Sequence, residues 1–217
     1  DLDILAGNIG LNTRFHASEN APLRLFANDF DKNGSIDPVI ALAESGEYRP
    51  AVQRDLLAAQ VPSIKKKFQR NAPYSEAAIA AIFSAKDLLS GICLDIKTLE
   101  TCWFKNDHGK FSRQQLPAFA QFSSTEKILV SDFNADGNAD ILVLGNDYGM
   151  EIETYQLDAS DGYIFAGNGK GEFSKIPNRI GNAGAVRDAV IIIGNKGKKI
   201  LLLVNNNGPA RAFNLLQ

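Results

Sequence analysis

Two short segments of the chain concentrate side-chain oxygen atoms, which are the ligands that hard cations bind. Residues 29–37 read DFDKNGSID and residues 132–140 read DFNADGNAD, so both follow the pattern D-x-[DN]-x-[DN]-G-x-x-D. Side-chain oxygens fall at the first, third, fifth and ninth positions, and the seventh residue offers its backbone carbonyl. The candidate ligands are Asp29, Asp31, Asn33, Ser35 and Asp37 in the first loop and Asp132, Asn134, Asp136, Asn138 and Asp140 in the second.

Spacing and charge both favour a divalent cation in these loops. Alternate residues of a tightly curled loop point at one centre, and Gly34 or Gly137 at the sixth position permits the sharp turn because glycine tolerates positive φ. Each loop gathers three carboxylates, and a like-charge pair at about 4 Å costs roughly 4 kcal/mol at an effective dielectric near 20. A cation reverses the sign of that interaction. Oxygen-only, irregular ligation favours Ca²⁺ over Mg²⁺, so we expect about two Ca²⁺ ions per chain.

The loops do not follow the EF-hand pattern, which needs a bidentate Glu at the twelfth position and a helix on each side. Ile40 and Val143 occupy the twelfth positions, and both loops lead into apolar, strand-like sequence. Without that Glu we expect weak affinity, at about 10⁻⁴–10⁻³ M. An Asx-rich turn without metal would explain one such segment, but two full matches in one chain favour metal binding.

Short strands separated by Gly, Asn and Asp account for most of the sequence, which predicts an all-β protein. Each strand is a few residues long, apolar or alternating, and is closed by turn residues. The predicted strands cover residues 4–6, 23–27, 38–43, 127–130, 141–144, 163–166, 189–193 and 200–204.

Residues 50–91 differ from this pattern and predict a small helical insertion. Pro50 and Pro62 suit first helical positions, where the missing N–H is not needed. Ser84 with Asp87 three residues later resembles a capping box at a helix start.

The strand pattern repeats along the chain. Asp3 stands at the position of Asp140 when the two most similar segments are superposed. Units of about four short strands, recurring about every 60 residues, are typical of β-propeller blades. The matching segments are 1–8 with 138–146, 103–117 with 164–177, and 189–206 with 127–146.

The last and first repeats depart from the loop pattern. Ile192, Ile193 and Lys196 fall where acidic ligands would be, so we expect no calcium in the last repeat. Asp1 and Asp3 resemble the tail of a loop whose start is missing, so we expect no complete site there either. The chain opens on aspartate without a methionine, which is typical of a mature chain or a fragment.

Composition excludes several classes of function. A net charge of −2 provides no positive field for nucleic acid, and no apolar run approaches the ~20 residues that span a membrane. Cys93 and Cys102 do not make a disulfide scaffold, although they could pair in an oxidising compartment. His16 and His108 do not lie at a zinc-ligand spacing from these cysteines.

The segments DFDKNGSID, DFNADGNAD and YIFAGNGKGEF resemble the FG-GAP or VCBS-type repeats of β-propellers in bacterial surface and secreted proteins. The propeller of integrin α chains is a more distant likeness. The resemblance implies one propeller-type repeat domain over residues 1–217, with the helical insertion at 50–91 inside it. It implies three to four blades, or a segment of a larger propeller, with loop acids holding calcium. It also implies an extracytoplasmic location: secreted, cell-surface or periplasmic.

The function that we expect from this resemblance is non-catalytic recognition of a protein or glycan, or adhesion, at a cell surface. Open blade edges would favour self-association or a partner chain. A calcium-dependent enzyme acting on polysaccharides is one alternative, but it needs an acid or base such as His, Lys or Tyr near the metal, and we predict no catalytic residue. A purely structural spacer is the other alternative.

Overall fold

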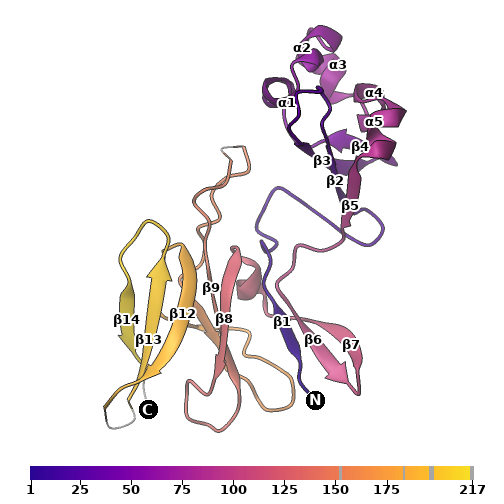
Figure 1. Cartoon of the computed structure of the whole chain (residues 1–217). Coiled ribbons are helices and arrows are strands. Elements are labelled where there is room, and N and C mark those ends of the chain that lie inside the picture. The colour runs from indigo at the N-terminus through magenta and orange to yellow at the C-terminus, as the bar shows by residue number, and fades with distance from the viewer. Residues whose placement is uncertain (152, 183, 196–197, 216–217) are drawn as a thin grey trace. The chain divides into compact units, whose positions relative to one another are not determined.

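The computed structural model describes residues 1–151, 153–182, 184–195 and 198–215 (Figure 1). The chain is mostly β, as predicted, and its strands form four antiparallel sheets. None of these sheets closes on itself within the described residues. The chain divides into two compact units, one made of residues 1–14 and 99–217 and the other of residues 15–98.

The unit of residues 15–98 contains a four-stranded sheet whose order is β4-β3-β2-β5. Five short helices lie between β4 and β5 in the chain. The strands are β2 (Leu23–Asn28), β3 (Asp37–Glu44), β4 (Glu47–Pro50) and β5 (Ile92–Ile96). The helices are α1 (Arg54–Gln60), α2 (Ser63–Lys67), α3 (Asn71–Ser75), α4 (Ile79–Ile82) and α5 (Ala85–Ser90).

Apolar side chains from the sheet and the helices share one core in this unit. Val39 of β3 and Leu57 of α1 are each 1% exposed, and Ile64 of α2 is 2% exposed. Helices as short as these are marginal in water by themselves. Burial against the sheet therefore stabilises them more than helix propensity does.

The predicted helix signals can be compared with the structure, and Pro62 lies directly before α2, which begins one residue later than predicted. The helix start at Ser84 is confirmed, because Ser84 is the N-cap of α5 and its Oγ accepts the backbone N–H of Asp87 at 3.1 Å, while the Asp87 carboxylate accepts the Ser84 hydroxyl. The prediction of Pro50 as a first helical residue is wrong. Pro50 ends β4, an edge strand where a residue without an N–H is tolerated, and α1 begins at Arg54.

The other unit contains three sheets, with orders β1-β6-β7, β11-β10-β9-β8 and β12-β13-β14. A short 3₁₀ helix, Ala118–Gln121, precedes β8. The strands are β1 (Ile4–Ala6), β6 (Cys102–Asp107), β7 (Lys110–Gln115), β8 (Thr125–Ser131), β9 (Asp140–Gly145), β10 (Tyr163–Phe165), β11 (Asn178–Arg179), β12 (Val186–Ile193), β13 (Lys199–Asn205) and β14 (Arg211–Asn214).

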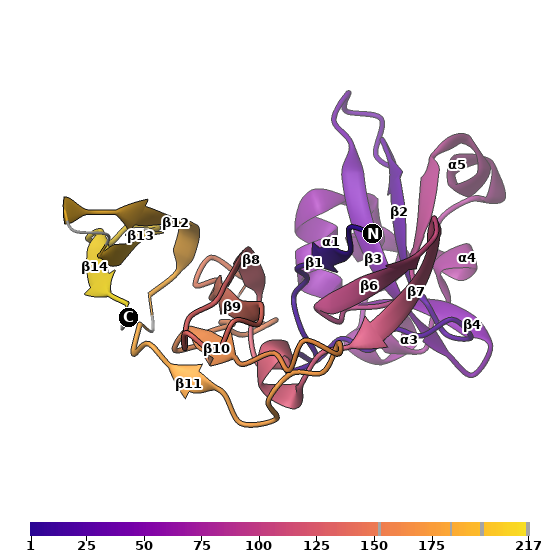
Figure 2. The same cartoon turned by 90° about the horizontal axis from the view of Figure 1, so that it is seen from below.

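Within this unit the three sheets follow one another side by side, with apolar side chains between them (Figures 1 and 2). Every residue of β9 is buried, because one face of its sheet packs toward β1 and the other toward β12. Ile141 belongs to the first of these cores and Leu142 to the second. The alternation of side chains along a strand places consecutive residues on opposite faces.

The two cysteines are both free thiols. Cys93 is exposed on β5, whereas Cys102 is buried on β6. No helix in the described part of the chain has the length and apolar character to cross a membrane.

Candidate metal-binding loops

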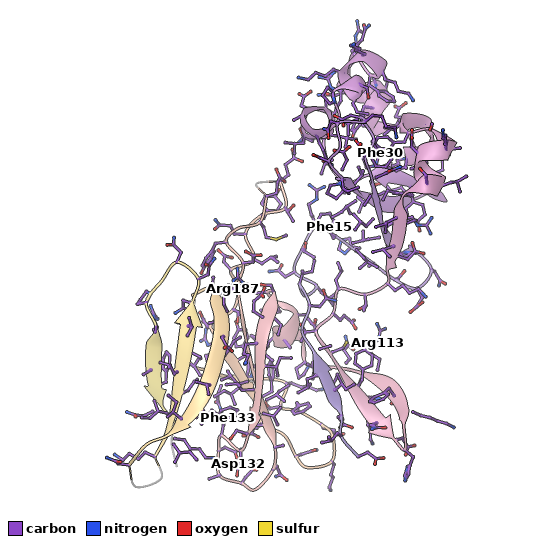
Figure 3. The ribbon with its side chains drawn as sticks, viewed as in Figure 1. Phe15, Phe30, Arg113, Asp132, Phe133 and Arg187 are labelled. Atoms are coloured by element: carbon purple, nitrogen blue, oxygen red, sulfur yellow. The ribbon has the colours of Figure 1, made fainter. Side chains whose placement is uncertain are left out.

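The two aspartate-rich segments occupy the same place in two hairpins. The first connects β2 to β3 and the second connects β8 to β9. In each hairpin the residue before the loop pairs with the ninth loop position, as Asn28 with Asp37 and Ser131 with Asp140. Figure 3 places Asp132 in the turn that follows β8. Strand pairing therefore closes both loops at the same two positions of the pattern.

The loop backbones also share their turns. The fourth positions, Lys32 and Ala135, have φ of 64° and 62°. The sixth positions, Gly34 and Gly137, have φ of 92° and 85°, in the left-handed region that glycine enters at low cost. Two left-handed residues separated by one other residue curl each loop sharply.

The first aspartate of each loop accepts hydrogen bonds from the backbone of the turn that follows it. Its two carboxylate oxygens accept the backbone N–H groups of the fifth and sixth residues, which fixes the curl. The distances are 2.9 Å from Asn33 and 2.9 Å from Gly34 to Asp29, and 3.2 Å from Asp136 and 2.9 Å from Gly137 to Asp132.

The remaining ligand positions repeat this correspondence. The third position accepts the N–H of the fifth, the fifth accepts that of the seventh, and the ninth accepts that of the second. In the first loop these are Asn33 to Asp31 (3.1 Å), Ser35 to Asn33 (2.8 Å) and Phe30 to Asp37 (2.9 Å). In the second loop they are Asp136 to Asn134 (3.0 Å), Asn138 to Asp136 (2.8 Å) and Phe133 to Asp140 (2.9 Å).

The first loop brings three carboxylates into the reach of one ion. Single oxygens of Asp29, Asp31 and Asp37 all lie within 4.8 Å of one another. Asp37 is 3% exposed and the other two are half-buried. Buried or half-buried carboxylates at this separation repel each other, and a hard dication between them converts the repulsion into attraction.

The second loop has the same plan with a different order of acids and amides. Asn134 replaces the acid at the third position, and Asp136 replaces the amide at the fifth. The pKa of Asp136 lies below its usual range, first because the backbone N–H of Asn138 donates to it and then because of the Asn134 side chain. Asp140 is fully buried and also accepts the N–H of Gly167 at 2.9 Å.

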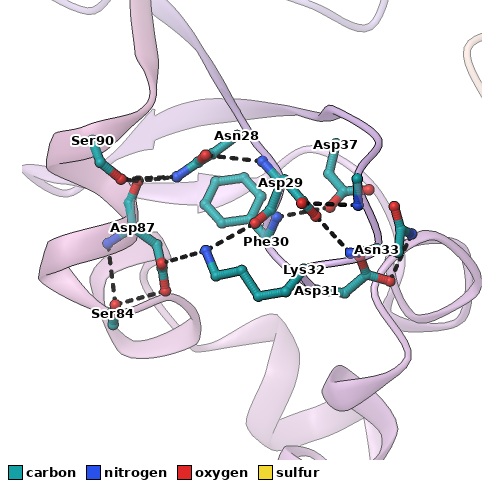
Figure 4. A network of polar contacts seen from close by, with 11 residues as sticks. Asn28, Asp29, Phe30, Asp31, Lys32, Asn33, Asp37, Ser84, Asp87 and Ser90 are labelled. Carbon is teal, nitrogen blue, oxygen red and sulfur yellow. Dashed lines mark hydrogen bonds and ion pairs between the residues drawn. The ribbon is translucent and has the colours of Figure 1, made fainter.

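The sequence interpretation overlooked Lys32, a basic residue inside the first loop. Its ammonium donates to Asp87 Oδ1 of α5 at 2.9 Å and to the carbonyl of Asp29 at 3.0 Å (Figure 4). Asp87 also accepts the hydroxyl of Ser84 at 2.7 Å. Ser84 first and Lys32 second lower the pKa of Asp87. Lys32 thus connects the loop to the helical region, and its presence at the fourth position was visible in the sequence.

The first and last repeats, which depart from the loop pattern in sequence, can also be located in the structure. Residues 194–198 join β12 to β13, and Lys196 lies outside the described residues. Asp3 precedes β1, where its Oδ1 accepts the N–H of Asn106 at 2.8 Å and its Oδ2 accepts the indole N–H of Trp103 at 2.9 Å. Asp1 accepts the N–H of His108.

Comparison of the chain with protein-family models, with curated proteins and with solved structures found no match.

Proposed function

We propose that this chain is a calcium-binding β-repeat module that holds one Ca²⁺ in each of its two loops. The observation that carries the proposal is that two loops with different residues at the third, fourth, fifth, seventh and eighth positions form the same hydrogen bonds position by position. Different residues that converge on one hydrogen-bond pattern favour a shared ligand over a chance turn, although only the first loop brings three carboxylates within 4.8 Å of one another among the described residues.

The donor set fits a hard cation. A carboxylate has about four lone-pair sites, so one backbone donor per oxygen leaves acceptor capacity for a metal. Aspartate, asparagine and carbonyl oxygens at these positions are the ligands of calcium, and the set contains no sulfur or imidazole that would favour zinc. Calcium in the loop neutralises the clustered charge and stabilises the hairpin that carries it.

The same proposal includes the propeller-type architecture. The FG-GAP or VCBS-type assignment is supported by the loop sequences, by the sheets that stand side by side, and by the correspondence between two strand junctions. Asp3 accepts the N–H of Asn106 just as Asp140 accepts that of Gly167. With this assignment we also propose an extracytoplasmic location and non-catalytic binding of a protein or glycan, with self-association through open sheet edges.

Lys32 bears on the enzymatic alternative. Its pairing with Asp87 raises the pKa of the ammonium, and a protonated amine is not a general base at neutral pH. Lys32 is therefore not the general base that a calcium-dependent enzyme would need. A structural spacer differs from a recognition module only in lacking a ligand surface, and glycan-array binding with and without chelator separates the two.

Each loop supplies the matched variant that tests the calcium sites. Asp31→Asn gives the first loop the residue that the second carries at its third position, and Asp136→Asn gives the second loop the residue that the first carries at its fifth. An asparagine already occurs at each of these positions in the other loop, whose backbone has the same turns. Titration calorimetry should find about two sites in the unmodified chain. Each variant should weaken one site roughly tenfold, which corresponds to about 1.4 kcal/mol.

The control removes one negative charge outside the loops, at exposed Glu76. Glu76→Gln should leave both sites unchanged, and in EDTA neither loop variant should melt at a lower temperature than Glu76→Gln, because the loop substitutions remove repulsion between carboxylates. One site or none in the unmodified chain would contradict the proposal. Equal losses of affinity in Glu76→Gln and in the loop variants would show that net charge alone attracts the ion.

A further inference from the structure

Three side chains at the start of the first loop contact the helical part of the same unit. Asn28, directly before the loop, donates through Nδ2 to the carbonyl of Asp87 in α5 at 2.6 Å. The ring of Phe30 stacks on that of Phe83, which follows α4, with centroids 3.9 Å apart. Lys32 Nζ donates to Asp87 Oδ1 at 2.9 Å. The loop that carries the candidate ligands is therefore fastened to α5 and to the segment before it (Figure 4).

Lys32 places a positive charge at the edge of the carboxylate cluster. Its ammonium donates to the Asp29 carbonyl at 3.0 Å, and Asp29 is one of the three residues whose carboxylate oxygens lie within 4.8 Å of one another. A lysine side chain has a flexible stem of four carbons. An ammonium that reaches the main chain of Asp29 can therefore turn to the carboxylate of the same residue. In that position it would be an internal cation that competes with a metal ion.

The Asp87 carboxylate holds this ammonium outside the cluster. Its Oδ1 accepts from Lys32, while its Oδ2 accepts the hydroxyl of Ser84 at 2.7 Å. Ser84 is the N-cap of α5, so the start of a helix orients the carboxylate. The side chain of Asp87 is 24% exposed and that of Lys32 is 64% exposed. The acid is thus the more buried member of the pair, and it determines where the flexible lysine lies.

The second loop has a related contact that comes from another strand. Ala135 stands at its fourth position, with φ of 62° against 64° at Lys32. Lys199 of β13 donates to the carbonyl of Asp132 at 3.4 Å. The first carbonyl of each loop therefore receives an ammonium. Only in the first loop does this ammonium belong to a residue of the loop itself.

We propose that Asp87 is a positioning residue that keeps the Lys32 ammonium away from the carboxylates of the first loop and so sets the affinity of this loop for Ca²⁺. The inference rests on the proposed calcium function and concerns the regulation of the first loop alone. Without the Asp87 charge, the ammonium is released toward the cluster, and the loop binds calcium less tightly. Because coupling between two equilibria is reciprocal, calcium in the loop also favours the contact of Lys32 with α5.

Hydrogen exchange, followed against calcium concentration in the full chain, tests the two loops separately. Segments 29–37 and 132–140 each give a calcium midpoint in one experiment. Asp87→Asn keeps the shape of the side chain and removes its charge. The midpoint of residues 29–37 should move to about three- to fivefold higher calcium, which is the range of an exposed ion pair. The midpoint of residues 132–140 should stay unchanged and is the internal reference.

A second substitution separates positioning from helix stability. Lys32→Ala gives the first loop the residue that the second carries at the same position and φ. Alone it should lower the calcium midpoint of residues 29–37, because a positive charge is removed. In the Lys32→Ala background, Asp87→Asn should have almost no effect, since the ammonium that it held is gone. If Asp87 served only to stabilise α5, its replacement would cost the same in both backgrounds.

The control variant is Asp55→Asn. Asp55 lies in the first turn of α1, as Asp87 does in α5, and it also forms an ion pair, with Arg54 at 2.6 Å. Asp55→Asn should leave both midpoints unchanged. A shift in Asp55→Asn as large as that in Asp87→Asn would show that the charge of the unit, and not the position of Lys32, sets the affinity.

The outcomes distinguish this inference from the proposed function. If calcium leaves the exchange of residues 29–37 unchanged in the unmodified chain, the calcium site of the first loop fails and the inference fails with it. If both segments respond to calcium but Asp87→Asn does not move the midpoint of residues 29–37, only the inference is overturned. Equal shifts by Asp87→Asn with and without Lys32 would overturn it as well.

Discussion

The glycines at the sixth loop position show how one residue type sets the loop geometry. Gly34 and Gly137 have φ of 92° and 85°, and no atom lies within 4 Å of an added Cβ at either residue. Replacement by alanine therefore strains only the backbone. We expect Gly34→Ala and Gly137→Ala each to lower the free energy of unfolding by about 1–2 kcal/mol in urea denaturation without calcium.

Gly208→Ala is the control for this prediction. Its added Cβ meets ordinary contacts at 3.4 and 3.8 Å, and its φ lies outside the left-handed region. We expect almost no change in the free energy of unfolding. A loss at Gly208 as large as that at Gly137 would mean that positive φ does not decide the outcome.

The loop pattern predicted two separate curled segments, and the structure has both. This curl was predictable because the turn and the side chains that accept its N–H groups lie within nine consecutive residues, whereas the role of the ten candidate residues as metal ligands stays a prediction. The pairing of Lys32 with Asp87 was not predictable in this way. Those residues meet only because α5 folds against β2, which is a property of the unit and not of the local sequence.

At the scale of the elements, one ion pair joins β5 to its neighbour β2. Asp95 accepts two hydrogen bonds from Arg24, at 2.6 and 3.0 Å, and the two residues face each other in the ladder. Arg24 lowers the pKa of Asp95 below 3.8. The folded state therefore gains stability from Asp95 above pH 3.8, and this gain is lost as the pH falls through the lower folded pKa.

Asp95→Asn should remove this part of the pH dependence. Urea midpoints measured from neutral pH to below 3.8 should fall less steeply in Asp95→Asn than in the unmodified chain. Glu76→Gln removes a carboxylate outside the pair and should keep the original slope. An unchanged slope in Asp95→Asn would contradict a role for this ion pair.

Strands with clear apolar patterns were predicted, and all eight occur with bounds that differ by at most three residues from the expected ones. The strands that were missed depend on their partners. β5 is mostly exposed and owes its conformation to pairing with β2, and β11 is only Asn178–Arg179. Pro50 misled the prediction because proline suits both a helix start and an edge strand.

At the scale of the whole molecule, the two compact units have separate cores. Leu57 belongs to the core of residues 15–98, and Leu142 belongs to a core of the other unit. Each side chain is at most 1% exposed. Either leucine replaced by alanine should cost about 2–5 kcal/mol. We expect Leu57→Ala to reduce amide exchange protection in β2 and β3, and Leu142→Ala to reduce it in β9 and β13.

The two variants act as controls for each other. Protection lost throughout the chain in both cases would mean that the units unfold as one. The sequence predicted one domain over residues 1–217 with the helices as an insertion. The structure shows that β2–β5 form a sheet of their own with those helices. The division into compact units depends on which strands pair across long stretches of sequence. Local sequence patterns do not show that pairing.

Because one thiol is exposed and the other is buried, the rate at which the thiols react reports the opening of the sheet that contains β6. Cys93 is accessible, while burial both hides Cys102 and raises its pKa. Since the thiolate is the reactive form, a colourimetric disulfide reagent should titrate one equivalent quickly and the second only when β6 detaches from β1 and β7. The slow phase would time the separation of those strands without any label.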